Sequence, residues 1–398
     1  TEMRLLQTVH HEHLVECYGV FLWDPQFPRT KPCLVMELMH ISVAAVLDVP
    51  FAKMWSLPMP SDDQKETDLG STDSDANGDA NADANADAPG ADDINQSELD
   101  PLLRSAVNFF ASVQNRLEIM KQVALGLDYL HNRTPAVVHR DLKPGNVMLK
   151  QSRRRGTTAK TNTNTNTTAT NHKNSADNGT ASYAHKHNRS QFIAKITDLG
   201  LSRSNQNMTA TMTATHRGPV RFSQLAAGAG TPSFMSPEQW TMQDFQSTKA
   251  DVFSFGMMLF AVMCWVPVPW IAKKESSYER LLAGDENGHD DLETIEKRIK
   301  NDEWPVWPTA LPHVNQDNHK SSSQTSTSGS SGSRSECELV PIPNALRAVT
   351  ECTFHSDPCR RVRMTAVIRL LAGEPKDDVL NMMNFVNRSP VFTQVDVN

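Results

Sequence analysis

The stretch VVHRDLKPGNVMLK, residues 137–150, concentrates the chemical groups that phosphoryl transfer requires. Such a reaction needs a carboxylate facing the incoming hydroxyl, metal ions on the phosphates and a cation near the developing charge. Asp141 can accept the hydrogen bond of a substrate hydroxyl, and Lys143 can lie beside the transferring phosphate. Asn146 can bind a metal through its amide oxygen, a hard ligand that suits Mg²⁺. The spacing therefore predicts a phosphoryl-transfer loop.

A second carboxylate is needed across the metal, and the stretch KITDLGLSR, residues 195–203, supplies it. Asp198 stands in a glycine-containing turn directly after the apolar run FIAKIT, which is typical of a strand. The alternative is that Asp141, Asn146 and Asp198 only cap helices or shape turns. The combined spacing favours metal and substrate binding over that alternative.

The composition limits which other functions the chain can have. It has 398 residues, 38% of them hydrophobic, and a net charge of −7, so no basic field attracts nucleic acid. Six cysteines occur without a CxxC pair, which favours reduced thiols in a cytosolic protein over a disulfide framework or a zinc site. We therefore expect a cytoplasmic protein that has no nucleic-acid partner.

Three stretches lack the apolar residues needed to form a core. They are residues 61–100, 151–190 and 316–336, rich in Asn, Asp, Ala, Thr or Ser. Burial cannot offset the chain entropy of such sequences, so they are predicted to be disordered insertions. The remaining roughly 300 residues correspond to a single catalytic domain.

Hydrophobic periodicity predicts the ordered elements between these insertions. The run CLVMELM, residues 33–39, reads as a buried strand, and NVMLK and FIAKIT as a strand pair on either side of the second insertion. A helix of about four turns is expected before residue 137. Downstream the pattern is mainly helical, which gives an α+β fold. The predicted helices there lie at 252–265, in YERLLAG and LETIEKRIK, at 343–353 and at 364–372.

One uncharged segment, residues 252–271, is long enough to raise the question of a membrane span. Pro267 and Pro269 break its last third, and the apolar helix of about 14 residues that remains suits a protein core better. No membrane segment is therefore predicted.

Three stretches together resemble the signature of the protein kinases. They are HRDLKPGN at 139–146, DLG at 198–200 and GTPSFMSPE at 230–238, in the family's order and at compatible spacing. The resemblance extends from residue 1 to about 373, leaving 374–398 as a C-terminal tail. It implies a two-lobed fold with a small β-rich N-lobe and a mainly helical C-lobe, and it implies ATP and Mg²⁺ as cofactors and a protein substrate.

The resemblance assigns roles to individual residues. Asp141, Lys143, Asn146 and Thr231 are the implied catalytic residues, with Asn146 and Asp198 as metal ligands. The implied ATP-binding residues are Glu2, Met36, Glu37, Met39, Met148 and Asp198. The implied structural residues are His139, Gly200, Glu238, Asp251 and Arg361, with Asp251 bracing the loop backbone and Arg361 pairing with Glu238. Taken singly, several of these residues could equally be core residues, a helix cap or surface charges.

Lys143-Pro144 and Thr231 resemble serine/threonine kinases, and phrases such as KITDLGLSR are similar to the tyrosine-kinase-like group. Arg140 beside Asp141 implies regulation, because a phosphate on the following hydroxyl-rich loop would bind this cation. An upstream activating kinase is then a partner. A tyrosine or dual-specificity kinase is the alternative within the family.

The family's glycine-rich phosphate loop and the lysine that pairs with Glu2 are absent from this sequence. We interpret the chain as an N-terminally truncated kinase domain that has little activity by itself. The alternative from another class is a pseudokinase-like scaffold or docking module. Retention of Asp141, Asn146 and Asp198 favours the enzyme.

Overall fold

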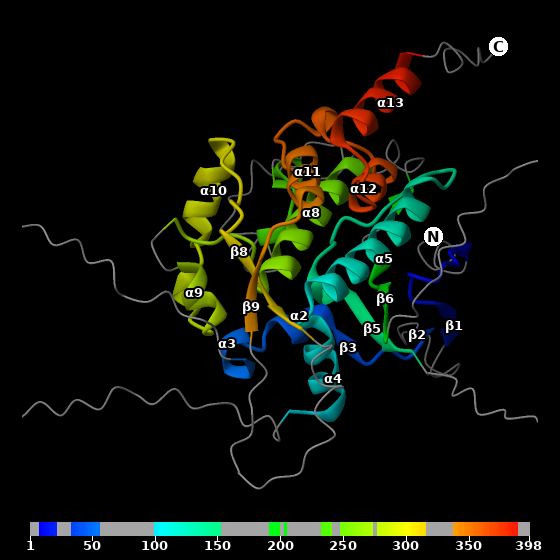
Figure 1. Cartoon of the computed structure of the whole chain (residues 1–398). Helices are drawn as coiled ribbons and strands as arrows, with labels where there is room; N and C mark the ends of the chain where they lie inside the picture. Colours follow the sequence, from blue (N-terminus) through cyan, green and yellow to red (C-terminus); the bar gives the residue numbers. More distant parts are fainter. Residues whose placement is uncertain are drawn as a thin grey trace, which may run out of the picture.

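The structure is a computed structural model that describes residues 8–21, 33–55, 99–152, 191–199, 203–204, 232–240, 247–273, 277–315 and 337–388. A small sheet-rich part lies beside a larger, mainly helical part (Figure 1). This confirms the predicted α+β architecture with two lobes of different composition. The predicted insertions fall outside the described residues except at 99–100 and 151–152, where Asp100 caps a helix and Gln151 ends a strand.

The small part contains an antiparallel pair of strands, β1 (Cys17–Phe21) and β2 (Cys33–Met36). The prediction of a strand in residues 33–39 is confirmed, but the prediction that it is buried is wrong. Val35 is 46% exposed and Met36 43% exposed. Within the described part of the chain this sheet has two strands, so side chains on both faces have little to pack against.

A second sheet connects the small part to the helices. Its strands are β3 (Ile41–Ser42), β5 (Val147–Gln151) and β6 (Phe192–Ile196), in the order β3-β5-β6. The predicted strand pair is confirmed, since β5 and β6 are antiparallel neighbours. Burial alternates along both strands, as expected when one face of a sheet meets a core.

The segment before β1 adds to the free edge of this sheet. The backbone N–H of Val15 donates to the carbonyl of Ile196 at 2.9 Å, and Ile196 N–H donates to the carbonyl of His13 at 2.9 Å. The ring of His11 stacks on Tyr129 with 4.9 Å between centroids. These contacts fix the N-terminal segment against both the sheet and the helix that carries Tyr129.

Two long helices form the centre of the helical part. Helix α5 (Val113–His131) is the predicted helix before residue 137, and α8 (Thr248–Cys264) is the predicted apolar helix. From Ala250 onward every residue of α8 is buried. The two helices lie side by side and in contact within the body of the molecule (Figure 1). Among the described residues, no helix is long and apolar enough to cross a membrane.

A close helix contact explains one glycine of α8. A Cβ atom built on Gly256 would lie 2.2 Å from Thr353 Oγ1, at the end of helix α11 (Asn344–Thr353). Any larger side chain would force the two helices apart, because packed interiors have little free volume.

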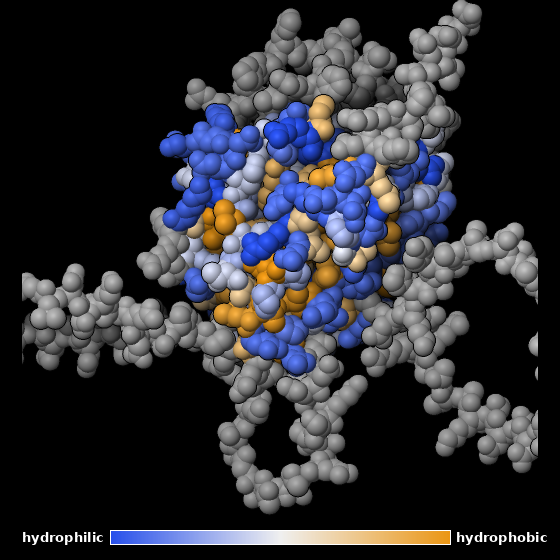
Figure 2. All heavy atoms as spheres, turned by 45° about the horizontal axis from the view of Figure 1, so that its top comes forward, coloured by the Kyte–Doolittle hydropathy of each residue, from blue (hydrophilic) through white to orange (hydrophobic). Residues whose placement is uncertain are grey.

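The remaining elements surround this core. The helices are α2 (Val43–Leu47), α3 (Phe51–Met54), α4 (Pro101–Phe110), α7 (Pro237–Trp240), α9 (Ser277–Leu282), α10 (Leu292–Lys300), α12 (Met364–Leu371) and α13 (Lys376–Arg388). The short strands β4 (Val137–Val138) and β7 (Arg203–Ser204) pair with each other. The 3₁₀ turns used below are η1 (Pro144–Asn146) and η4 (Pro232–Phe234). Figure 2 shows one face, with hydrophilic residues dominating its upper part and apolar residues gathered lower down.

A β-hairpin in the helical part was not predicted. Strands β8 (Ala310–Val314) and β9 (Cys337–Pro341) pair on either side of the third insertion. The hairpin is held through Arg116 of α5, which is fully buried and donates to the carbonyls of Phe110 and Pro312. Its guanidinium lies 5.6 Å from the ring of Trp265, and burial lowers the pKa of Arg116 to about 10. The side chain stays charged at neutral pH and joins α4, α5 and the hairpin.

Candidate active site

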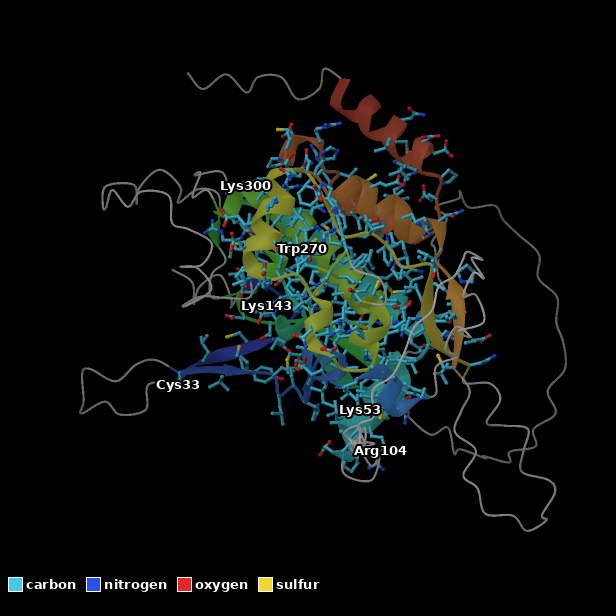
Figure 3. The ribbon with its side chains drawn as sticks, turned by 90° about the vertical axis from the view of Figure 1, so that its left-hand side faces the viewer. Cys33, Lys53, Arg104, Lys143, Trp270 and Lys300 are labelled. Carbon is cyan, nitrogen blue, oxygen red and sulfur yellow. The ribbon has the colours of Figure 1, made fainter. Side chains whose placement is uncertain are left out.

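The loop at residues 139–146 brings three predicted catalytic residues together. It follows β4 and ends with η1. The carboxylate of Asp141 accepts hydrogen bonds from Lys143 Nζ at 2.8 Å and from Asn146 Nδ2 at 3.0 Å. Asn146 Nδ2 also donates to the Asp141 carbonyl at 2.7 Å. Both bonds of Asn146 use its amide nitrogen, so its amide oxygen faces away from Asp141. In the view of Figure 3, Lys143 lies between Cys33, the first residue of β2, and Trp270.

A buried carboxylate on α8 holds the backbone of this loop. Asp251 is 1% exposed and accepts the N–H groups of His139 and Arg140, each at 2.8 Å. It also contacts His131 Nε2 at 2.8 Å. Burial alone raises the pKa of Asp251, but the hydrogen bond and charge of His131, with the Arg140 N–H, bring it below its ordinary value. Arg140 has φ 74°, in the left-handed region, so these bonds support a conformation that costs free energy.

The ring of His139 connects the loop to the segment that carries Asp198. Its Nε2 lies 2.9 Å from the Thr197 carbonyl, and its Nδ1 lies 3.3 Å from the Asp141 N–H. One neutral tautomer satisfies both bonds, with Nε2 donating and Nδ1 accepting. His139 is fully buried, and Leu199 is 5% exposed.

The two predicted metal ligands lie on adjacent backbone segments. Thr197 N–H donates to the carbonyl of Asn146 at 2.9 Å, so the residue before Asp198 is bonded to Asn146. Asp198 is exposed and has φ 59°, which turns the chain after β6. A carboxylate and an amide oxygen fit Mg²⁺, which binds to one or two protein groups together with phosphate and water oxygens. Among the described residues, no group of three His, Cys, Asp or Glu side chains is placed so that it could hold a metal ion.

The segment after β2 is bound from one side by two lysines. The carboxylate of Glu37 contacts Lys195 Nζ at 2.8 Å and also Lys150 Nζ. The backbone N–H of Glu37 donates to the Glu16 carbonyl at 2.8 Å. Burial raises the pKa of Glu37, but the hydrogen bonds from Lys150 and Lys195 outweigh it and leave the pKa below its ordinary value.

The predicted adenine-binding residues flank the cluster formed by Glu37, Lys150 and Lys195. Met148 pairs with Lys195 across β5 and β6, and Lys150 is two residues further along, so all three lie on one face of the sheet. That face is the half-exposed one. Met36 and Met39 precede and follow Glu37 in the chain, and both are accessible.

Removing the more buried of the two lysines is expected to cost more stability. The Lys195 side chain is 12% exposed and the Lys150 side chain 42% exposed. Water can therefore replace Lys150 beside the Glu37 carboxylate more readily than it can replace Lys195. We expect Lys195→Met to lower the free energy of unfolding by about 1–2 kcal/mol and Lys150→Met by less than about 1 kcal/mol. Urea denaturation of the 398-residue chain measures both. Equal losses would show that burial does not set the strength of this cluster.

A buried ion pair fixes α7. Arg361 Nη1 and Nη2 donate to the two carboxylate oxygens of Glu238 at 2.6 and 2.8 Å. The same guanidinium donates to the carbonyls of His355 and Lys249 and lies 5.0 Å from the ring of Phe253. Arg361 thereby joins Glu238, the last residue of the segment GTPSFMSPE, to a part of the chain more than one hundred residues further on.

Three predicted site residues, Glu2, Gly200 and Thr231, lie outside the described residues, and their roles stay predictions. Sequence reasoning missed several residues with evident contacts at the site. They are His131, Lys150, Lys195, Ser236 and Gln239. The two lysines follow the alternation of β5 and β6, so their side of the sheet could have been predicted. The other three have no distinguishing pattern.

Comparison with known proteins agrees with this geometry. The family model described as the protein kinase domain matches residues 92–370. The fold and the loop held by Asp251 are thus those of a kinase catalytic domain, and the chain belongs to the protein kinase family.

Its relatives include a leucine-rich repeat receptor-like serine/threonine-protein kinase of Arabidopsis thaliana, 30% identical over 176 residues, 44% of this chain and 14% of that protein. Serine/threonine-protein kinase CTR1 of Arabidopsis thaliana is 27% identical over 158 residues, 39% of this chain and 12% of the relative. Serine/threonine-protein kinase 33 of Mus musculus is 27% identical over 177 residues, 44% of this chain and 27% of the relative. The matches thus span less than a third of each of these relatives.

Proposed function

We propose that the protein is a serine/threonine kinase that transfers the γ-phosphate of ATP to a hydroxyl of a protein substrate. One observation carries the proposal: Lys143 and Asn146 both donate hydrogen bonds to the carboxylate of Asp141, on a loop whose backbone is held by Asp251. The three relatives described above are each named serine/threonine-protein kinases, which supports the choice of acceptor residue.

Each side chain has a defined task in this proposal. Asp141 accepts the hydrogen bond of the substrate hydroxyl and orients it toward the phosphate. Lys143, 2.8 Å from that carboxylate, is close enough to offset the negative charge of the transferred group. Asn146 and Asp198 would hold Mg²⁺, which neutralises charge on the phosphates when bound.

ATP would bind beside the segment that contains Met36, Glu37 and Met39, with Met148 beneath the adenine. The half-exposed face of β5 that carries Met148 lies beside this segment, because Lys150 on the same face contacts Glu37. Arg140 would receive a phosphate placed on the following loop by an activating kinase.

The test is an assay of labelled phosphate transfer from ATP to a protein substrate, on the full-length product of the gene, with and without Mg²⁺. Transfer is expected with Mg²⁺ and is expected to be lost on chelation and in Asp198→Asn, because an amide binds the metal more weakly than a carboxylate. Equal transfer by the wild type and Asp198→Asn would exclude the metal role. Absence of transfer by the wild type under all conditions would favour a scaffold.

A further inference from the structure

The peptide group between Arg140 and Asp141 is held at both of its polar atoms. Its N–H, from Asp141, points to His139 Nδ1 at 3.3 Å. Its carbonyl, from Arg140, accepts a hydrogen bond from Gln239 Nε2 at 2.8 Å. This peptide group directly precedes Asp141, so its plane sets the direction in which the Asp141 side chain leaves the backbone. Gln239 comes from α7, ninety-nine residues further along the chain.

The amide of Gln239 has a fixed orientation. Its Oε1 accepts two hydrogen bonds from Ser236, from the hydroxyl at 2.8 Å and from the backbone N–H at 3.0 Å. Because Oε1 faces the Ser236 N–H and Nε2 faces a carbonyl, the flipped amide would lose both of these bonds. Ser236 is fully buried, so its hydroxyl has no water to bind in place of Gln239.

The backbone of α7 is itself rigidly placed. Glu238, the residue before Gln239, forms the two-bond pair with Arg361, and the Glu238 side chain is 7% exposed. Gln239 N–H also donates to the Ser236 carbonyl at 3.0 Å. The side chain of Gln239 therefore extends from a fixed point to the loop that carries Asp141.

We propose that Gln239, oriented by Ser236, is a positioning residue that sets the Arg140–Asp141 peptide and through it the carboxylate of Asp141. The inference rests on the proposed kinase function. It assigns to residues 236–239 a direct part in aligning the loop, beyond the ion pair of Glu238. Asp251 fixes the loop at two backbone N–H groups and Gln239 fixes it at a carbonyl, so the two act on different atoms.

Removing the amide should lower turnover without weakening ATP binding. In Gln239→Met, a side chain of similar length cannot donate to the Arg140 carbonyl, and we expect kcat to fall about 10- to 100-fold. The KM for ATP is expected to stay near that of the wild type, because the residues proposed to face the nucleotide are untouched. The thermal midpoint is expected to fall modestly, because the buried Ser236 hydroxyl and N–H lose their acceptor. Ser236→Ala should give a smaller loss, and the double variant should be no worse than Gln239→Met, because both act through one amide.

A charged isostere provides a readout that a purely structural role would not produce. Gln239→Glu can still accept from Ser236, but its carboxylate has no donor for the Arg140 carbonyl. Because the carboxylate keeps both bonds from Ser236, the thermal midpoint is expected to stay closer to that of the wild type than in Gln239→Met. Its kcat is expected to fall at least as far as that of Gln239→Met, since a carboxylate oxygen would face the Arg140 carbonyl oxygen. A kcat of Gln239→Glu near that of the wild type would contradict the proposal.

The matched control is Gln191→Met. Gln191 Nε2 donates to Ser105 Oγ at 2.9 Å, the same kind of glutamine–serine bond, on β6's N-terminal side and remote from the loop. Its kcat is expected to match the wild type. In an active full-length protein, a kcat of Gln239→Met within about twofold of the wild type, or an equal loss in Gln191→Met, would overturn the inference and leave the kinase function intact. An inactive wild type would instead reject the proposed function.

Discussion

Asp141→Asn is expected to reduce kcat for phosphate transfer by about 10³-fold, the larger part of what a positioned acid–base group contributes. The amide can still accept a bond from Lys143 or Asn146, so the loop keeps its shape. It cannot take a proton from the substrate hydroxyl, and it adds a donor where the hydroxyl should donate. The affinity for ATP, measured by equilibrium binding, is expected to stay within a fewfold of the wild type, because the role proposed for Asp141 is to contact the acceptor hydroxyl and not the nucleotide.

The control for this variant is Asp128→Asn on α5. Asp128 accepts a hydrogen bond from the hydroxyl of Thr365 at 2.8 Å, on the exposed side of the helix. Asp128→Asn makes the same chemical change on the helix that precedes the Asp141 loop, and the kcat of this variant is expected to equal that of the wild type. If Asp141→Asn kept more than about a tenth of the wild-type kcat, Asp141 would not have the assigned role.

Arg361→Met is expected to lower the free energy of unfolding by about 3–5 kcal/mol. Both partners of the pair with Glu238 are buried, and the methionine would leave the Glu238 carboxylate in the interior without its two charged hydrogen bonds. It would also remove the donors to the carbonyls of His355 and Lys249. Urea denaturation of the 398-residue chain measures the loss. Arg361→Lys should be intermediate, because an ammonium cannot reproduce the two parallel bonds.

An exposed pair provides the comparison. Arg280 donates to one carboxylate oxygen of Asp285, Oδ2, through Nε and Nη2 at 2.8 and 2.6 Å, so this pair also has two charged hydrogen bonds. The Arg280 side chain is 46% exposed, and water replaces the lost bonds. Arg280→Met is expected to leave the denaturation midpoint nearly unchanged. Similar midpoints for the Arg361 and Arg280 variants would contradict the view that α7 is fixed by a buried charge pair.

Local patterns were sufficient to predict the core of the fold. The apolar spacing that predicts α5 arises because one face of that helix packs in the core, and the continuous apolar run of α8 arises because the helix is buried all round. The alternation in NVMLK and FIAKIT predicted β5 and β6, since one face of their sheet is buried. Burial on a regular element leaves a regular sequence pattern.

Features that depend on distant partners could not be predicted. The run Cys33–Met36 is as apolar as a buried strand, yet it is exposed, because burial depends on what packs against it. The hairpin of β8 and β9 pairs strands separated by more than twenty residues, with prolines in both. The hydrogen bond from Gln239 to the Arg140 carbonyl joins residues that are ninety-nine positions apart in the chain. A single glutamine in SPEQW does not indicate which distant residue it contacts.

The candidate site was predicted from its motif and not from periodicity. The positions of Asp141, Lys143 and Asn146 in one loop determined that they would be neighbours, and the structure places them within hydrogen-bond distance. The partners that stabilise the loop, His131 and Gln239, come from other elements and become apparent only in three dimensions.

Phospho-amino-acid analysis tests the central claim most directly. The full-length product of the gene is incubated with γ-labelled ATP, Mg²⁺ and a protein substrate containing serine, threonine and tyrosine, beside its Asp141→Asn variant. Label is expected on serine or threonine with the wild type and is expected to fall about 10³-fold with the variant. Label on tyrosine alone, or equal label with both proteins, would contradict the account.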